Sequence, residues 1–297
     1  MIATVNIEHS SDVRWWRYTY RVPMLVWHLL VHLPITLIMI NPITARVYLA
    51  GERLDYHMVR FWQGNLMRIF GFRLVKFGAA HPGACLSVAN HVSWLDITLI
   101  HSQRVVHFVA KSEISRWPLI GWMARRAGTI YHRRGNTDSL AAVAQLMVER
   151  MRAGESVGVF PEGGSSTSFV VRTFHARIFQ PPVEAAVPVQ PIALRYARDG
   201  ALAHSVPFRV GESFLSNFVR LLGESGGDAE VHFLPIVPVA ANARRALAEL
   251  SKNAISRVVG ANQDASQNND HQNNDRQNND RQPNAGNHPE NTLSAKP

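Results

Sequence analysis

A histidine and an aspartate follow a short apolar run, and their types are those of a general base and its carboxylate partner. The run Cys85–Ala89 predicts a buried strand, and residues 94–100 predict the helix that follows it. Five residues along an ideal helix correspond to a separation of about 140°, so His91 and Asp96 cannot share one helix face. They can meet only if His91 lies on the strand-to-helix turn and Asp96 reaches back from the first helical turn.

This pair has both a catalytic and a structural interpretation. A carboxylate held against an imidazole fixes its tautomer and stabilises its protonated form, as a general base for a hydroxyl requires. In the structural interpretation, Asn90 or Ser93 caps the helix and His91 is a core residue. Asp96 would then be an ordinary first-turn carboxylate that the helix dipole favours. The pair alone leaves both interpretations open.

Three more blocks follow in the chain. The strand-like run Val157–Phe160 opens onto a carboxylate and a glycine-rich turn, Pro161-Glu162-Gly163-Gly164-Ser165-Ser166. Residues 128–134 form another short run that ends in paired arginines, and residues 187–194 form an apolar run with two prolines. Together with the block around His91, these segments are short strands followed by polar turns.

The four blocks resemble those of the glycerolipid acyltransferases typified by 1-acyl-glycerol-3-phosphate acyltransferase. That family has Asn-His-x4-Asp, a Gly-x-Ile-Phe-Ile-x-Arg-like run, Phe-Pro-Glu-Gly and a strand with proline, in this order, and the similarity covers about residues 55 to 240. The resemblance implies acyl transfer from acyl-CoA or acyl carrier protein to the free hydroxyl of 1-acyl-glycerol-3-phosphate, which forms phosphatidic acid. It implies His91 as the base, Asp96 as its partner, no covalent acyl-enzyme, and neither a metal nor a cofactor.

The resemblance also implies that Arg134 and Glu162 bind or orient the acceptor. Lys111 closes the strand-like run Val105–Ala110, so we expect it to point at the same edge of the sheet and to contribute charge to a phosphate. Backbone N–H groups of Gly163 and Gly164, or of a helix start, are expected to stabilise the oxyanion. Pro191 is expected to shape the neighbouring strand end.

One departure from the family pattern concerns the acceptor. Many members have Glu-Gly-Thr-Arg-Ser where this chain has Glu162-Gly163-Gly164-Ser165-Ser166, so the arginine is missing. Its absence weakens the prediction of a glycerophosphate headgroup, and lyso-ornithine lipid or another lysolipid is the alternative acceptor. A non-catalytic scaffold that binds membrane lipid is an alternative of a different class.

The N-terminal part predicts attachment to a membrane. Aromatic and basic side chains gather at residues 15–18, and residues 22–40 are largely apolar but contain His28, His32 and Pro34. This segment can span a bilayer or lie in its interface. The net charge of +9 suits anionic lipid, a phosphorylated substrate or nucleic acid, but the scattered Arg and Lys residues argue against nucleic acid. The expected location is the cytoplasmic face of the inner membrane.

The rest of the chain predicts an α/β fold with a mixed, largely parallel sheet flanked by helices. Short strand-like runs, among them residues 208–211 and 231–235, alternate with helical stretches from residue 72 onward. Sites in such sheets lie at the carboxyl ends of strands, where His91, Arg134 and Glu162 should converge. We expect membrane-associating helices in residues 1–70 and an acyltransferase domain in residues 71–260. The Asn-, Gln- and Asp-rich residues 261–297 should be disordered, and the single cysteine, Cys85, excludes an internal disulfide.

Overall fold

The computed structural model describes residues 12–118, 120–133, 137–239 and 244–260. The chain divides into residues 1–260 and 261–297. The predicted disorder of the tail and the predicted position of Arg134 both lie outside the described residues.

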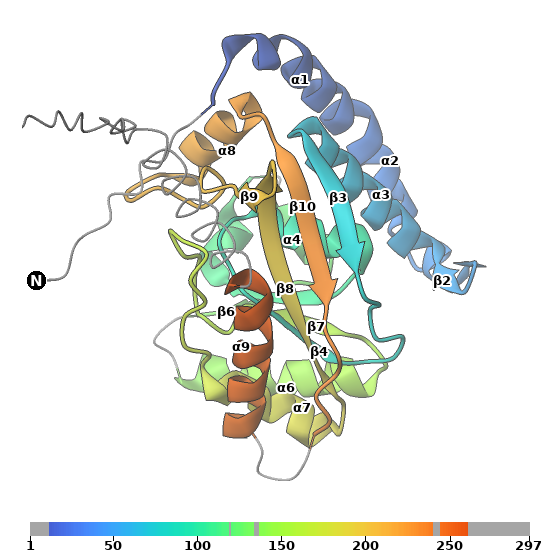
Figure 1. Cartoon of the computed structure of the whole chain (residues 1–297). Helices are drawn as coiled ribbons and strands as arrows, with labels where there is room; N and C mark the ends of the chain where they lie inside the picture. Colours follow the sequence, from blue (N-terminus) through green and yellow to red (C-terminus); the bar gives the residue numbers. More distant parts are fainter. Residues whose placement is uncertain (1–11, 119, 134–136, 240–243, 261–297) are drawn as a thin grey trace, which may run out of the picture. The chain divides into compact units, whose positions relative to one another are not determined.

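The large sheet is mixed and largely parallel, as predicted. Its strand order is β3-β10-β8-β4-β7-β5-β6, and the short β9 pairs with β8. β10 runs parallel to β3 but antiparallel to β8, and the pairs from β8 to β6 are parallel (Figure 1). The strands are β3 Phe72–Phe77, β4 Leu86–Ala89, β5 His107–Lys111, β6 Ile130–His132, β7 Val157–Val159, β8 Val189–Arg198, β9 Ala201–Leu202 and β10 Gly227–Phe233. A separate small hairpin joins β1 Tyr48–Leu49 to β2 Glu52–Arg53.

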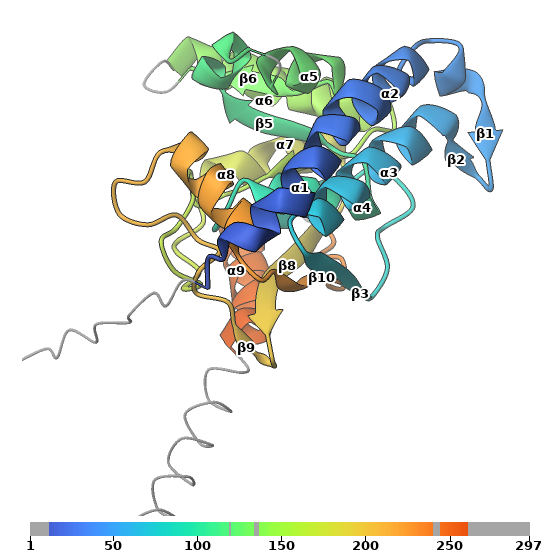
Figure 2. The same ribbon diagram turned by 90° about the horizontal axis from the view of Figure 1, so that it is seen from above.

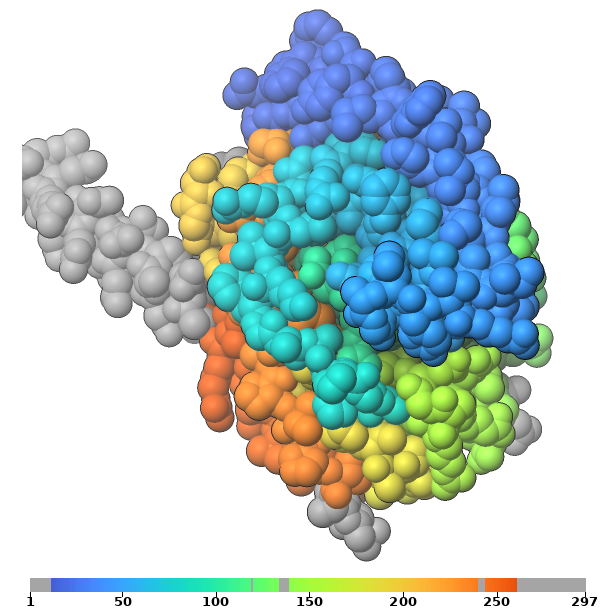
Figure 3. Space-filling model, turned by 90° about the vertical axis from the view of Figure 1, so that its right-hand side faces the viewer, coloured from blue at the N-terminus to red at the C-terminus, as the bar shows by residue number. Residues whose placement is uncertain are grey.

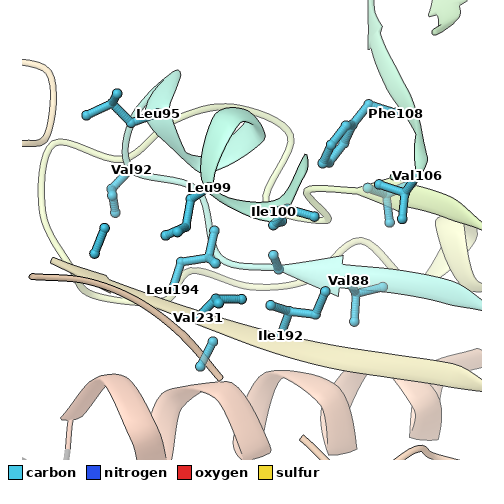
Figure 4. Close-up of a cluster of buried hydrophobic side chains, with 14 of the residues drawn as sticks. Val88, Val92, Leu95, Leu99, Ile100, Val106, Phe108, Ile192, Leu194 and Val231 are labelled. Carbon is cyan, nitrogen blue, oxygen red and sulfur yellow. The ribbon is translucent and has the colours of Figure 1, made fainter. Parts of the chain in front are cut away.

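Helices cover both faces of this sheet. α4 lies over one face and α9 over the other, with buried aliphatic side chains of β4, β8 and β10 between them (Figure 4). Because both faces are covered, every residue of β4 is buried, which explains why its sequence is a continuous run and does not alternate. The helices that follow β3 are α4 Leu95–Gln103, α5 Ile120–Arg126, α6 Thr137–Arg152, α7 Gln180–Ala185, α8 Phe214–Gly223 and α9 Arg244–Gly260.

The strand predicted at residues 208–211 was wrong. This segment is a turn in which the Glu212 backbone N–H donates to the carbonyl of Arg209, and Val210 is 93% exposed. The Glu212 carboxylate accepts from the Arg209 backbone N–H and pairs with Arg220 of α8. Ser213 then caps α8 by accepting from the Ser216 N–H. These side-chain contacts favour a helix entry over a strand.

The N-terminal helices pack along one side of the part of the chain that contains the large sheet. α1 Trp15–Trp27, a π-helical turn at His28–His32 and α2 Leu33–Met39 form one continuous helical segment, which lies beside α3 Leu54–Ile69 (Figure 2). The segment Trp15–Met39 is long and apolar enough to cross a membrane. The space-filling view shows the helical segment and α3 as adjoining surfaces (Figure 3).

Two buried arginines tie α1 to the end of α8. Arg17 donates to the carbonyl of Gly223, and Arg21 donates to the carbonyls of Leu222 and Glu224. Carbonyls at the end of a helix lack intrahelical partners, and positive charge there is favourable. One face of α1 is therefore held against protein.

A buried histidine in α4 makes stability depend on pH. Burial lowers the pKa of His101 to about 4, against an ordinary value near 6.5, while its Nε2 donates to the carbonyl of Val106 at 3.0 Å. Between those two values the unfolded state binds more protons, so the free energy of unfolding should fall as the pH is lowered from about 6.5 to about 4. We expect a loss of about 2 to 3 kcal/mol from this residue between pH 7 and pH 4.5.

Chemical unfolding of the detergent-solubilised protein at these two pH values measures the effect. His101→Gln keeps an N–H donor for Val106 but does not titrate, so its loss of stability should be smaller than that of the wild type by the stated amount. Equal losses in the two proteins would contradict the assignment to His101.

Candidate active site

The site lies where β4 leaves the sheet and turns into α4. Asn90 fixes this exit, because its side-chain amide donates to the carbonyl of Leu194 at 3.0 Å and accepts from the N–H of Leu194 at 2.8 Å. Asn90 thus continues the pairing of β4 with β8 by one residue and does not cap α4, although it was one of the two residues predicted as possible caps. His91 follows on the turn itself, as predicted.

His91 and Asp96 meet as the spacing predicts. Nδ1 of His91 lies 2.8 Å from Oδ2 of Asp96, which reaches back from the first turn of α4. The same oxygen accepts the backbone N–H groups of Val92 at 2.7 Å and Ser93 at 2.9 Å. Because Oδ2 accepts from all three nitrogens, Nδ1 of His91 carries its hydrogen, and Nε2 holds the lone pair that can accept a proton.

Tyr196 of β8 holds the other oxygen of Asp96. Its hydroxyl donates to Oδ1 at 2.8 Å, and both side chains are fully buried. Burial raises the pKa of Tyr196 well above its ordinary value, and the nearby Asp96 raises it further. The phenol is therefore protonated near neutral pH and donates to Asp96. The sequence analysis did not identify Tyr196, although a tyrosine in a buried strand needs a partner for its hydroxyl.

The glycine-rich turn after β7 holds the backbone of His91. Oε1 of Glu162 accepts the His91 N–H at 2.9 Å, and the Ser166 N–H donates to the His91 carbonyl at 2.7 Å. The ring of Phe160 stacks on the imidazole at a centroid distance of 4.0 Å. The structure thus brings Glu162 next to His91, in agreement with the predicted convergence of these two positions. Acceptor binding by Glu162 itself stays a prediction.

Arg172 is a second residue that the sequence analysis missed. Its backbone N–H and its Nε donate to Oε2 of Glu162 at 3.1 and 3.2 Å, and its terminal nitrogen donates to the carbonyl of Gly164. A signal existed, since a carboxylate at a buried strand end requires a countercharge. No spacing rule assigned that charge to a residue ten positions downstream.

Some of the amides expected at the oxyanion site have other partners. The Gly163 N–H donates to the carbonyl of Phe160, and the N–H groups of Val92 and Ser93 donate to Asp96. Gly163 adopts a φ of +77°, which favours glycine at this point of the turn. The predicted role of Gly163 in oxyanion stabilisation therefore requires that its N–H exchange partners.

The remaining predicted binding residues differ in position. Lys111 closes β5, as predicted, and its side chain is exposed. Pro191 lies inside β8, opposite Val88 near the end of the neighbouring β4, and its carbonyl accepts from the Leu234 N–H. Their contacts with substrate stay predictions.

An apolar surface adjoins the His91 turn. Trp94 packs against Phe214 and Phe218 of α8, and its indole N–H donates to Asn217 at 3.1 Å. Trp117 extends this cluster by packing on Phe214. The polar turn around His91 therefore has aromatic rings beside it, as a site for an amphipathic substrate requires.

The chain is similar in sequence to known acyltransferases. The family model described as Acyltransferase matches residues 78–195. The chain is 36% identical over 202 residues to the lyso-ornithine lipid O-acyltransferase of Pseudomonas aeruginosa, covering 68% of this chain and 78% of that protein. It is 34% identical over 126 residues to the 1-acyl-sn-glycerol-3-phosphate acyltransferase of Neisseria gonorrhoeae, covering 42% and 49% of the two chains.

A solved structure supports the fold. The crystal structure of the 1-acyl-sn-glycerophosphate acyltransferase of Thermotoga maritima matches with a TM-score of 0.62 at 18% identity, covering 82% of this chain and 95% of that one. The range of this chain that the family model matches includes His91, Asp96 and Glu162. With a relative that is similar over most of its length, these findings show that the chain belongs to the acyltransferase family and is an acyltransferase.

Proposed function

We propose that this protein transfers an acyl chain from acyl-CoA or acyl carrier protein to the free hydroxyl of a lysolipid, with His91 as the general base. The observation that carries the proposal is the contact between Nδ1 of His91 and Asp96, which directs Nε2 away from the carboxylate. With its side chain 17% exposed, His91 can meet a hydroxyl from solvent or from the membrane interface.

The reaction balances without a covalent acyl-enzyme. The hydroxyl oxygen attacks the thioester carbonyl carbon while Nε2 of His91 takes the hydroxyl proton. Asp96 balances the charge of the resulting imidazolium. The tetrahedral intermediate then collapses, the carbon–sulfur bond breaks, and the departing thiolate takes the proton from His91. The rings of Trp94, Phe214 and Phe218 offer an apolar surface for the acyl chain.

We propose lyso-ornithine lipid as the first acceptor to test and 1-acyl-glycerol-3-phosphate as the second. The lyso-ornithine lipid acyltransferases of Pseudomonas aeruginosa and Brucella abortus match 78% and 79% of their own length, against 49% for the Neisseria protein. Ser165, which stands where many phosphatidic-acid-forming relatives have arginine, is exposed and uncharged. The motif blocks alone favour 1-acyl-glycerol-3-phosphate as the acceptor, and both observations shift the preference to lyso-ornithine lipid.

An assay with parallel acceptors tests the proposal. Purified protein in detergent receives labelled acyl-CoA, or acyl carrier protein as donor, with lyso-ornithine lipid, 1-acyl-glycerol-3-phosphate or a lysophospholipid with a larger headgroup. Product with the first alone supports the preferred acceptor, and product with the second alone restores phosphatidic acid formation. No product with any acceptor and either donor would favour the non-catalytic scaffold.

We further propose that α1 and α2 lie in the membrane interface on the cytoplasmic face of the inner membrane, where both acyl donors occur. Arg17 and Arg21 hold one face of α1 on α8, while the opposite face exposes large apolar side chains. A helix held against protein along one face suits an interfacial position better than a bilayer crossing. Trp27, Leu30 and Ile38 are 60%, 71% and 72% exposed.

Replacing Trp27, Leu30 and Ile38 together by glutamine should weaken vesicle binding by about 100-fold, at about 1 kcal/mol for each partly inserted side chain. Glutamine is chosen because it is a good helix former. Co-sedimentation with vesicles of phosphatidylethanolamine and phosphatidylglycerol measures the binding. Leu250→Gln on α9, where the side chain is 55% exposed, is the control and should bind like the wild type. Equal binding by the triple variant would contradict the proposed orientation.

A further inference from the structure

Glu162 is a buried carboxylate that is paired with a residue outside the motif blocks. Its side chain is 1% exposed, and among the residues that the structure describes Arg172 is the cation that reaches it, with Nε 3.2 Å from Oε2. A buried carboxylate without a partner costs several kcal/mol, so this pairing is a condition for Glu162 to be charged where it lies. The Arg172 side chain is 48% exposed, so its outer part is in solvent.

The contacts of Arg172 converge on the turn that holds His91. Arg172 donates to Glu162 from its backbone and from its side chain, and it donates to the carbonyl of Gly164 from its terminal nitrogen. Glu162 holds the His91 N–H, and Ser166, two residues after Gly164, holds the His91 carbonyl. The N–H and the carbonyl of His91 are therefore both bonded to residues 162–166, and Arg172 holds this segment in place through its hydrogen bonds.

We propose that Arg172 is a positioning residue for His91, acting through Glu162 and residues 162–166 and not by contact with the acceptor. This inference rests on the proposed role of His91 as the base. A general base must be held within hydrogen-bond reach of its proton, and a displacement of about 1 Å can lower the rate about 100-fold. Asp96 fixes the imidazole ring, and the chain from Arg172 to Glu162 fixes the backbone that carries it.

Steady-state kinetics of Arg172→Met and Arg172→Lys test the proposal on whichever acceptor the wild type uses. Arg172→Met should lower kcat about 10- to 100-fold, the effect of losing a charge-assisted hydrogen bond, with both KM values within about threefold of wild type. Arg172→Lys keeps the charge but cannot reach Glu162 and Gly164 together, so its kcat should lie between those of the wild type and Arg172→Met. A raised acceptor KM with unchanged kcat would overturn the proposal, as would unchanged kinetics.

A matched control is available at the carboxyl end of β8. Arg198 donates to the carbonyl of Gly226 and to the buried carboxylate of Glu224, with a side chain 27% exposed. Arg198→Met removes the same kind of interaction without touching the His91 turn. Its kcat and KM should stay within about threefold of wild type.

A double-mutant cycle tests the route through Glu162. In the background of Glu162→Gln, Arg172 no longer balances a buried charge, so adding Arg172→Met should lower kcat by much less than it does in the wild type. Equal effects in both backgrounds would mean that Arg172 does not act through Glu162, and the proposal would fail.

Hydrogen exchange separates this inference from the proposed reaction, because it requires no turnover. The His91 amide of the full chain in detergent should exchange at least about tenfold faster in Arg172→Met than in wild type, and at the wild-type rate in Arg198→Met. If the wild type shows no acyl transfer but the His91 amide still exchanges faster in Arg172→Met, the positioning role is supported and only the proposed reaction is rejected. Unchanged exchange in Arg172→Met and Arg172→Lys would reject the positioning role whatever the activity.

Discussion

His91→Ala is expected to lower kcat by about 10² to 10⁴, the range typical of removing a general base. Nδ1 of His91 is held by Asp96, and no other described side chain of the turn offers a basic nitrogen at this position. Binding of the acyl donor and of the lysolipid should change little, because the imidazole is needed for proton transfer. Initial rates with labelled acyl thioester and the preferred acceptor give kcat and both KM values.

His232→Ala is a closely matched control for this variant. His232 is also 17% exposed, lies 3.0 Å from a carboxylate oxygen of Glu230, and stacks on Phe77. It is in β10, two strands from β4. His232→Ala should therefore keep its rate, and its change in stability shows what losing a stacked histidine in contact with a carboxylate does to the fold. If His91→Ala retained more than about a tenth of the wild-type rate, the role of His91 as the general base would be rejected.

The local part of the site could be predicted because it depends on few residues. A small apolar strand, a turn and a helix place His91 and Asp96, and the angle between positions on a helix already required Asp96 to reach back from its first turn. The mixed, largely parallel sheet followed from the alternation of strands and helices. These predictions use only neighbouring residues and the known geometry of helices and strands.

The long-range part could not be predicted in the same way. Tyr196 meets Asp96 across 100 residues and Glu162 meets His91 across 71, contacts that depend on which strands become neighbours. Local patterns do not encode that β10 inserts between β3 and β8, antiparallel to β8. The contact of Arg172 with Glu162 could not be predicted for the same reason. A buried carboxylate indicates that a cation is needed, but it does not indicate which one.

The strand predicted at residues 208–211 was wrong for a different reason. Its apolar residues suggested a strand, but the neighbouring Glu212 accepts a backbone N–H and pairs with Arg220. Polar contacts of a single side chain can outweigh a short apolar run, because that run buries little surface. Val210, at 93% exposure, contributes almost no burial to offset the turn.

Asp96→Asn is expected to lower kcat by about 10² to 10³ while the protein stays folded. The amide oxygen of asparagine can take the place of Oδ2, where Val92, Ser93 and His91 all need an acceptor, and its NH₂ group would then face the Tyr196 hydroxyl. The tautomer of His91 is kept, but the negative charge that stabilises the imidazolium is lost. That interaction is on the order of 4 kcal/mol for charges about 4 Å apart at a partly buried site.

Tyr196→Phe separates the charge of Asp96 from its hydrogen bonds. It removes the donor to Oδ1 and leaves both the carboxylate charge and the contacts at Oδ2, so kcat should fall by less than about tenfold. Asp96→Ala removes the acceptor altogether and leaves two buried N–H groups without a partner, so it should also lower the free energy of unfolding by about 2 to 4 kcal/mol. If Asp96→Asn kept a rate within about tenfold of wild type, the carboxylate would act only as the hydrogen-bond centre of the turn. The charge would then have no part in the proton transfer.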